Sequence, residues 1–421
     1  MKVCIPGSKS YTNRALIMAA LTKGPVHLIN ASYCDDTEAM IGCLRTLGVE
    51  IETMPNQIVV HGDVGSIAEQ FYTPRDASWR SSFETRGIYR LFAKDSGTTV
   101  RFMLALLCIV PGVKIIEGTP RLNERPIRDL VNGLRDLGAV IEYCDSDGCL
   151  PLKVSSSTLT GKSVHLKADV SSQFCTSLLL IAPYLPEGLT MQLVGPLISK
   201  SYVEMTVQCM QDWGVSVSRQ NGTFVIAPQC YRKQKYVIEG DFSSAGYFFA
   251  IAALTKSTIH VENINPCSVQ GDRKFLEALE KMGNVVTVEN NGICVQGKQV
   301  IPLDIDMEDC PDQVMTLAVL AAFADGITRI SGVRSLRVKE TERVVALKNE
   351  LGKMGIRTED THDTLTIYGG SPKSAEIATY NDHRMAMAFA VAKMRLPELI
   401  IRNPEVVSKT FPAFWFALYR S

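Results

Sequence analysis

One pattern recurs six times along this 421-residue chain: an apolar helical stretch, a short turn and an alternating strand, as in AALTKGPVHLIN and VLAAFADGITRISG. Successive turns are separated by 88, 76, 69, 69 and 72 residues. A period of this kind indicates one supersecondary unit that is repeated and stacked. The six turns are centred on Gly24, Gly112, Gly188, Ser257, Gly326 and Glu398.

A second series runs in register with the first. A helix followed by glycine and a strand appears 24, 26, 26, 26 and 29 residues after the first five turns. Glycine there is typical of a left-handed helix C-cap, where a side chain would be strained. Each unit should therefore hold two helices and several strands in about 70 residues. The glycines are Gly48, Gly138, Gly214, Gly283 and Gly355, and the extra material at 64–94 has no assigned role.

Charge and cysteine usage exclude several classes of partner. Lys+Arg and Asp+Glu both number 44, so no overall positive field is available for nucleic acid or an acidic membrane surface. No apolar run reaches the 18 residues of a membrane span. The twelve cysteines form no CxxC pair and are typical of structural thiols in a reducing cytosol. We expect a cytoplasmic protein.

Cations lie at the expected helix starts, where the positive end of the helix dipole disfavours them. A bound anion reverses that balance, because backbone N–H groups and the dipole both attract it. The pattern therefore predicts a polyanionic ligand where helix N-termini converge. Polar residues at the same starts are also typical N-caps, and capping alone accounts for Ser243 and Ser244. The cations are Lys9, Arg14, Arg101 and Arg384.

Further candidates lie on loops. Arginine forks bind carboxylate and phosphate in bidentate fashion, and lysine supplies a point charge. Asp312 and Glu340 are the acid–base candidates, although Asp312 is equally interpreted as an N-cap. Histidines show no HxxxH spacing and no nucleotide-binding loop occurs, so we expect neither a metal nor a cofactor. The loop cations are Arg121, Arg125, Arg337, Lys339, Arg343 and Lys409.

Seven sequence blocks occur in order along the chain. They are PGSKSYTNRA (6–15), SGTTVR (96–101), RLNERPI (121–127), SSQF (171–174), RVKETER (337–343), NDHRMAM (381–387) and SKTFP around Lys409. In this order they resemble the 3-phosphoshikimate 1-carboxyvinyltransferase family of enolpyruvyl transferases, also called EPSP synthases, and the resemblance covers essentially the whole chain.

The resemblance implies a two-domain inside-out α/β barrel of six βαβαββ units, three per domain, with the active site in the interdomain cleft. The domains would be 8–236 and 240–421 plus 1–7. It also implies a monomer that transfers the carboxyvinyl group of phosphoenolpyruvate to the 5-hydroxyl of 3-phosphoshikimate, in the shikimate pathway toward chorismate and aromatic amino acids.

The resemblance also implies a role for each matching residue. Asp312 would be the base, and Glu340 with Lys9 the acid. The residues implied for 3-phosphoshikimate are Lys9, Ser10, Arg14, Ser171, Ser172, Gln173, Ser199, Tyr202, Asp312, Ser335 and Lys339. Those implied for phosphoenolpyruvate are Lys9, Gly97, Arg101, Arg125, Gln173, Arg343, Arg384 and Lys409.

Two positions depart from the family pattern, and two other functions are compatible with the residues. Phe102 replaces a usual proline, and Ser335 stands where asparagine is common. A UDP-N-acetylglucosamine enolpyruvyl transferase shares the architecture, but it has asparagine in place of Ser10 and a reactive cysteine that the RLNERPI stretch lacks. A non-catalytic, polyanion-binding repeat protein would not need paired acid–base residues.

Overall fold

The computed structural model describes residues 1–63, 88–155, 159–167, 169–289 and 292–419, so most of the extra segment at 64–94 lies outside it. The chain forms two compact units. One is Lys9–Ile238, and the other combines Met1–Ser8 with Glu239–Ser421.

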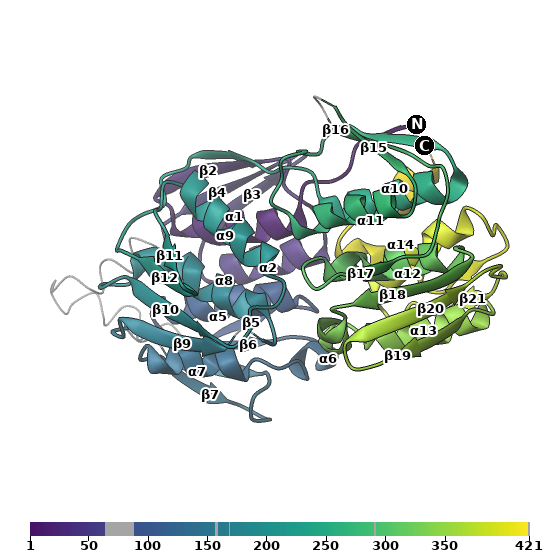
Figure 1. Ribbon diagram of the computed structural model, residues 1–421. Coiled ribbons are helices and arrows are strands. Elements are labelled where there is room, and N and C mark those ends of the chain that lie inside the picture. The colour runs from purple at the N-terminus through teal and green to yellow at the C-terminus, as the bar shows by residue number, and fades with distance from the viewer. Residues whose placement is uncertain (64–87, 156–158, 168, 290–291, 420–421) are drawn as a thin grey trace, which may run out of the picture. The chain divides into compact units, whose positions relative to one another are not determined.

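The unit Lys9–Ile238 contains three repeats, each with a four-stranded sheet (Figure 1). In every sheet the first two strands are parallel and the other pairs antiparallel, which is the βαβαββ order. The first repeat takes its opening strand, β13, from the far end of the unit. The elements are α1 (Lys9–Leu21), β2 (Gly24–Ile29), α2 (Asp35–Thr46), β3 (Glu50–Met54), β4 (Gln57–Gly62), β5 (Tyr89–Phe92), α5 (Gly97–Leu107), β6 (Val113–Glu117), α6 (Pro120–Asn123), α7 (Arg128–Asp136), β7 (Val140–Tyr143), β8 (Leu152–Ser155), β9 (Ser163–Lys167), α8 (Ser172–Ile181), η1 (Ala182–Tyr184), β10 (Leu189–Val194), α9 (Ser201–Asp212), β11 (Ser218–Gln220), β12 (Thr223–Ile226) and β13 (Lys235–Val237).

The second unit repeats this plan, with its first sheet opened by β1 near the N-terminus. Two of its sheets have four strands, while the last is the parallel pair β21–β22. The sixth repeat is thus reduced to βαβ within the described residues. The elements are β1 (Lys2–Val3), α10 (Phe242–Thr255), β14 (Thr258–Val261), η2 (Gly271–Lys274), α11 (Phe275–Lys281), β15 (Val285–Glu289), β16 (Gly292–Gln296), β17 (Asp304–Asp306), η3 (Pro311–Gln313), α12 (Val314–Ala322), β18 (Gly326–Ser331), η4 (Arg334–Val338), α13 (Arg343–Lys353), β19 (Arg357–Asp360), β20 (Thr364–Gly369), β21 (Glu376–Ile377), α14 (His383–Lys393), β22 (Ile400–Ile401), η5 (Pro404–Lys409) and α15 (Phe414–Tyr419).

Helices lie inside each unit and sheets outside, as the family resemblance implied. In one unit α1, α5 and α8 contact one another, and in the other α10, α12 and α14 do so. Nearly every residue of these helices is buried, which is typical of a helix that is apolar all round. Strands such as β9 alternate between exposed and buried residues, so one face of the sheet is exposed. The sheets remain separate across the described residues, without closing into a barrel.

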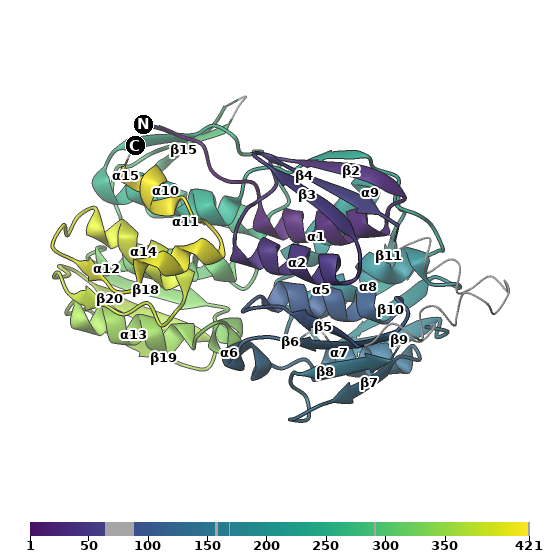
Figure 2. The same ribbon diagram turned by 180° about the vertical axis from the view of Figure 1, so that it is seen from behind.

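The second helices pack against the first, as α2 does on α1 and α5 (Figure 2). The five glycines that follow them have φ between 82° and 100°, which confirms the predicted left-handed caps. Many of the candidate residues lie at or near the N-termini of the inner helices. Among the described residues, no helix is long and apolar enough to cross a membrane.

Candidate active site

The helix starts predicted from polar residues are largely confirmed. Ser96 and Ser171 are the N-caps of α5 and α8, and each hydroxyl accepts a backbone N–H. Asp382 caps α14 by accepting from the Arg384 N–H at 2.9 Å. The prediction for Ser243 is wrong: its hydroxyl donates to Asp272 at 2.6 Å, and Asp241 occupies the N-cap position of α10.

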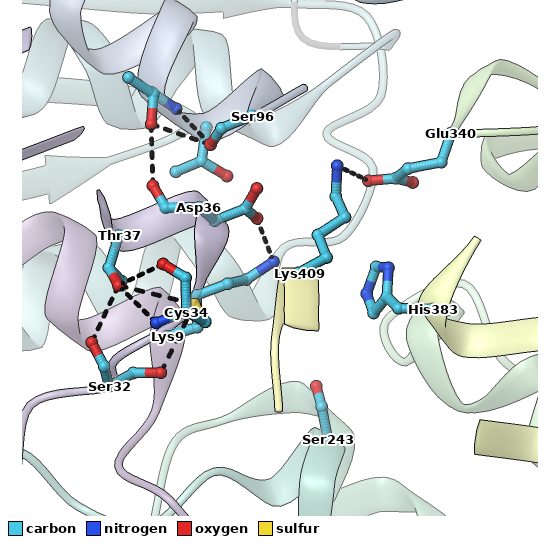
Figure 3. Close-up of polar contacts among 12 residues, drawn as sticks. Lys9, Ser32, Cys34, Asp36, Thr37, Ser96, Ser243, Glu340, His383 and Lys409 are labelled. Atoms are coloured by element: carbon cyan, nitrogen blue, oxygen red, sulfur yellow. Dashed lines mark hydrogen bonds and ion pairs between the residues drawn. The ribbon is translucent and has the colours of Figure 1, made fainter. Parts of the chain in front are cut away.

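Lys9 begins α1 and forms an ion pair with a residue that the sequence analysis missed. Its Nζ lies 2.7 Å from Oδ2 of Asp36, a carboxylate that is only 4% exposed (Figure 3). Asp36 belongs to the first turn of α2, and its carbonyl accepts from Thr99 Oγ1 at 3.2 Å. The signal in the sequence is weak, because the acidic pair Asp35-Asp36 opens a helix, where the helix dipole favours acidic residues in any case.

Arg14 is buried and held by neutral groups. Its guanidinium donates to the carbonyls of Ser10 and Tyr202, both at 2.8 Å, and to Thr206 Oγ1 at 2.9 Å. The guanidinium carbon of Arg14, Cζ, lies 5.5 Å from the centroid of the Phe102 ring. Phenylalanine in place of the family's usual proline therefore gives the cation an aromatic face. Burial lowers the pKa of Arg14. Three of its five N–H groups are used in these contacts, which leaves two for a ligand.

Two more arginines meet over the start of α5. A side chain at Gly97 would come within 2.8 Å of Arg125 Nη1 and 2.9 Å of Arg101 Nη1. Arg101 also donates to Gln173 Oε1 at 2.7 Å, and Gln173 Nε2 donates to Thr98 Oγ1 at 3.1 Å. The structure thus brings together four residues predicted separately. Two guanidinium groups and a helix N-terminus at one point form a strong anion-binding arrangement.

Two further serines and a tyrosine are candidates in this unit. Ser172 and Ser199 are 5% and 6% exposed, and Tyr202 is half-buried. Ser199 has φ of 49°, a left-handed conformation that is uncommon for a residue with a side chain. Strain of this kind concentrates at functional sites, which supports a binding role for the loop before α9.

In the other unit, Arg343 is surrounded by carboxylates. The side chain is 1% exposed, and its three nitrogens lie 2.7 Å from Asp382, 3.1 Å from Asp312 and 3.0 Å from Glu340. Burial alone would lower the pKa of Arg343, but the three carboxylates more than reverse the effect and raise it. The second oxygen of Asp312 lies 2.7 Å from Arg384, so this carboxylate bridges two arginines.

The remaining candidates of this unit either contact Glu340 or lie near it in the sequence. Lys409 Nζ lies 3.7 Å from Glu340 Oε1 (Figure 3). Lys339 directly precedes Glu340, after η4. Ser335, within η4, is 8% exposed, and its hydroxyl has no hydrogen-bond partner among the described residues. A buried hydroxyl of this kind is a candidate for a ligand contact.

These contacts correct one part of the sequence argument. The helix-start pattern predicts that Lys9 and Arg384 are unfavourable charges balanced by a ligand, but each has a carboxylate partner in the protein, Asp36 for Lys9 and Asp312 for Arg384. The loop cations Arg343 and Lys409 have carboxylate partners too, so a ligand anion would compete with protein carboxylates. Cations that lie among carboxylates can bind anions, and carboxylates such as Asp312 and Glu340 can transfer protons.

Comparisons with known proteins agree with this chemistry. The model of the EPSP synthase (3-phosphoshikimate 1-carboxyvinyltransferase) family matches residues 1–418. The 3-phosphoshikimate 1-carboxyvinyltransferase of Syntrophobacter fumaroxidans is 38% identical over 419 residues, covering 98% of this chain and 95% of the relative. That of Nostoc punctiforme is 39% identical over 421 residues, covering 99% and 95%.

The fold is also that of a solved structure. EPSP synthase from Acinetobacter baumannii, determined at 2.37 Å, superposes with a TM-score of 0.79 over all of this chain and 95% of the other. Sequence identity is 24%, so this likeness establishes the fold alone.

Proposed function

The chain belongs to the EPSP synthase (3-phosphoshikimate 1-carboxyvinyltransferase) family, and on this premise we propose how its residues carry out the reaction. The protein transfers the carboxyvinyl group of phosphoenolpyruvate to the 5-hydroxyl of 3-phosphoshikimate and releases phosphate, a step of aromatic amino-acid biosynthesis. The two alternatives, a UDP-N-acetylglucosamine transferase and a polyanion-binding scaffold, are not favoured by the family match.

The observation that carries the mechanism is the position of Asp312 between two arginines. Each of its oxygens accepts from a different guanidinium, from Arg343 at 3.1 Å and from Arg384 at 2.7 Å. These contacts fix the orientation of Asp312 and stabilise its ionised form, which is the form a general base requires. Asp312 takes the proton of the 5-hydroxyl, and the oxygen adds to C2 of phosphoenolpyruvate.

Phosphoenolpyruvate itself activates the acid–base pair in this account. Its carboxylate binds Arg343 and Arg384 and shares these arginines with Asp312 and Glu340. Because each cation is then shared with a further anion, both protein carboxylates hold a proton more tightly, while Asp312 keeps its orientation. Asp312 becomes a better base, and Glu340 can carry the proton that it delivers, with Lys9, to the methylene carbon. The tetrahedral adduct then loses phosphate and one proton of its new methyl group, which returns to Glu340, and the enol ether forms.

The other residues bind and orient the substrates. The phosphoenolpyruvate phosphate is bound by Arg125, Lys409 and the backbone of Gly97, and charge-assisted hydrogen bonds stabilise it as it becomes a leaving group. Lys9 and Gln173 contact both substrates, and Arg101 belongs to the same cluster of cations. Residues of both units are needed for the complete reaction. The residues we propose for 3-phosphoshikimate are Lys9, Ser10, Arg14, Ser171, Ser172, Gln173, Ser199, Tyr202, Asp312, Ser335 and Lys339.

We propose that the protein acts as a cytoplasmic monomer on these two small substrates and has no nucleic-acid partner, since its formal net charge is zero. Light scattering coupled to size-exclusion chromatography measures the oligomeric state. A mass twice that of the chain would contradict the monomer.

Asp312→Ala tests the assignment of the base. Turnover should fall by about 10²–10⁴-fold, because proton transfer by a positioned side chain contributes about that much. Calorimetric binding of 3-phosphoshikimate should change little by comparison. The control is Asp304→Ala on β17, an exposed aspartate paired only loosely with Arg329 at 3.5 Å. Near-normal turnover in Asp312→Ala would contradict the assignment of the base, and Asp312 would then be interpreted as a helix N-cap.

A further inference from the structure

A buried carboxylate that the mechanism above does not use lies beside the base. Asp272 belongs to η2 (Gly271–Lys274) and is 5% exposed. It accepts a hydrogen bond from Ser243 Oγ at 2.6 Å and another from Cys310 Sγ at 3.5 Å. Burying an acid is unfavourable unless its oxygens are hydrogen-bonded, so both contacts stabilise it.

Both contacts lead to Asp312. Ser243 accepts from Arg384 Nη2 at 3.3 Å, and the same nitrogen donates to Asp312 Oδ2 at 2.7 Å. Cys310 lies two residues before Asp312, at the start of η3. Asp272 therefore contacts two residues near Asp312. One is Cys310, in the segment that carries Asp312, and the other is Ser243, which orients the Arg384 guanidinium that is bound to Asp312.

The direction of the hydrogen bonds follows from the donors available. Ser243 has one hydroxyl proton, and Asp272 in its ionised form can only accept, so that proton points to Asp272. The lone pairs of Ser243 are then left to accept from Arg384. An ionised Asp272 thus orients the serine in the one way that suits the guanidinium.

Asp272 also affects Asp312 through charge. The groups that face Asp272 are Asp312 near η3, Asp241 at the start of α10 and Arg384 of α14. Burial, followed by the charge of Asp312, raises the pKa of Asp272 to about 6, against the opposing effect of Arg384. The charged side chains around it on its own and the next helix, Arg273, Lys274, Glu277, Glu280 and Lys281, are exposed or half-exposed.

We infer that Asp272 is a positioning residue for the Asp312–Arg384 pair: through Ser243 it orients the guanidinium, and through its own negative charge it makes Asp312 a stronger base. The inference rests on the proposed function, because it assigns Asp312 and Arg384 the roles given above. It predicts separate effects for the charge and for the serine.

Three variants separate these effects. Asp272→Asn keeps the shape and removes the charge, Ser243→Ala removes the connection to Arg384, and Ser244→Ala is the matched control. Ser244 is the next residue of α10, equally buried, and its hydroxyl donates to Asp241 at 2.8 Å instead. Kinetic constants for both substrates are measured across pH, and circular dichroism checks that each variant is folded.

Asp272→Asn should lower kcat about 10-fold and move the acid limb of its pH profile to lower pH, because Asp312 loses a neighbouring negative charge. Ser243→Ala should raise the KM for phosphoenolpyruvate about 10-fold and leave the acid limb in place, since misplacing a binding group has effects of this order. Ser244→Ala should change neither quantity.

An unchanged acid limb in Asp272→Asn, or a Ser243→Ala variant that behaves like Ser244→Ala, would overturn the inference while leaving the enzyme assignment intact. If Asp272→Asn does not fold, the two serine variants decide alone. A wild-type protein without turnover would instead contradict the proposed function. Calorimetric affinity for phosphoenolpyruvate in Ser243→Ala against Ser244→Ala would then decide whether the network positions Arg384.

Discussion

Arg343 shows why a single residue in this protein cannot be exchanged for another of the same charge. Its three nitrogens each contact a different carboxylate, from Asp382, Asp312 and Glu340. A lysine ammonium is a point charge and cannot span three partners in a plane.

Arg343→Lys should therefore raise the KM for phosphoenolpyruvate and reduce kcat together. It should also lower the free energy of unfolding by about 3–5 kcal/mol, the usual effect of leaving buried charges unpaired. Arg357→Lys on β19, where the arginine is 70% exposed, is the control and should change neither quantity. Substrate kinetics and urea denaturation measure the two effects. A variant as stable and active as the control would show that the three contacts contribute little.

Lys114 is a second residue whose behaviour depends on burial. Lys114 is fully buried on β6. Its Nζ donates at 2.5 Å to the carbonyl of Val110, a residue just after the end of α5. Burial lowers the pKa of Lys114 from 10.5 to about 7. The unfolded chain therefore binds a proton that the folded protein releases between about pH 7 and 10.5.

Because the unfolded state binds more protons in this window, stability should rise with pH, by at most about 1.4 kcal/mol per pH unit. Lys114→Met removes the titrating amine and should flatten this part of the curve. Denaturant unfolding of the wild-type protein and of Lys114→Met, at several pH values between 7 and 9, measures the two free energies of unfolding to be compared. Parallel curves would mean that Lys114 keeps its ordinary pKa in the folded protein.

At the scale of elements, the start of α5 matters most, because Gly97 leaves room for two arginines. A methyl group there would lie 2.8 Å from Arg125 Nη1 and 2.9 Å from Arg101 Nη1, so the side chains would have to move. Gly97→Ala should raise the KM for phosphoenolpyruvate about 10-fold with little loss of stability. The control is Gly42→Ala in α2, where an added methyl group meets nothing within 4 Å. Equal kinetics in the two variants would contradict the proposed role of this helix start.

The elements also show what the sequence could and could not predict. The repeat period and the helix-ending glycines predicted the six units, because both are local features of the chain. The carboxylate partners of Lys9 and of Ser243 were not predictable, since Asp36 and Asp272 reach these two residues only through tertiary packing. Ser243 was interpreted as a cap for the same reason. Local patterns located the cations, but the carboxylates that balance them required the structure.

At the scale of the whole molecule, each unit has a different set of functional groups. Lys9–Ile238 carries the arginine pair at the start of α5, and the other unit carries Asp312 and Glu340 within their arginine contacts. The acid–base pair that we propose, Asp312 and Glu340, belongs to the second set. The account therefore requires both substrates and both sets of residues for any turnover.

The most direct test incubates the full chain with 3-phosphoshikimate and phosphoenolpyruvate, and measures released phosphate together with the enol ether by mass spectrometry. The account predicts one phosphate for each enol ether formed, no release when either substrate is omitted, and no product with UDP-N-acetylglucosamine. Phosphate released only with UDP-N-acetylglucosamine, or no release with any acceptor while the protein is folded, would contradict it.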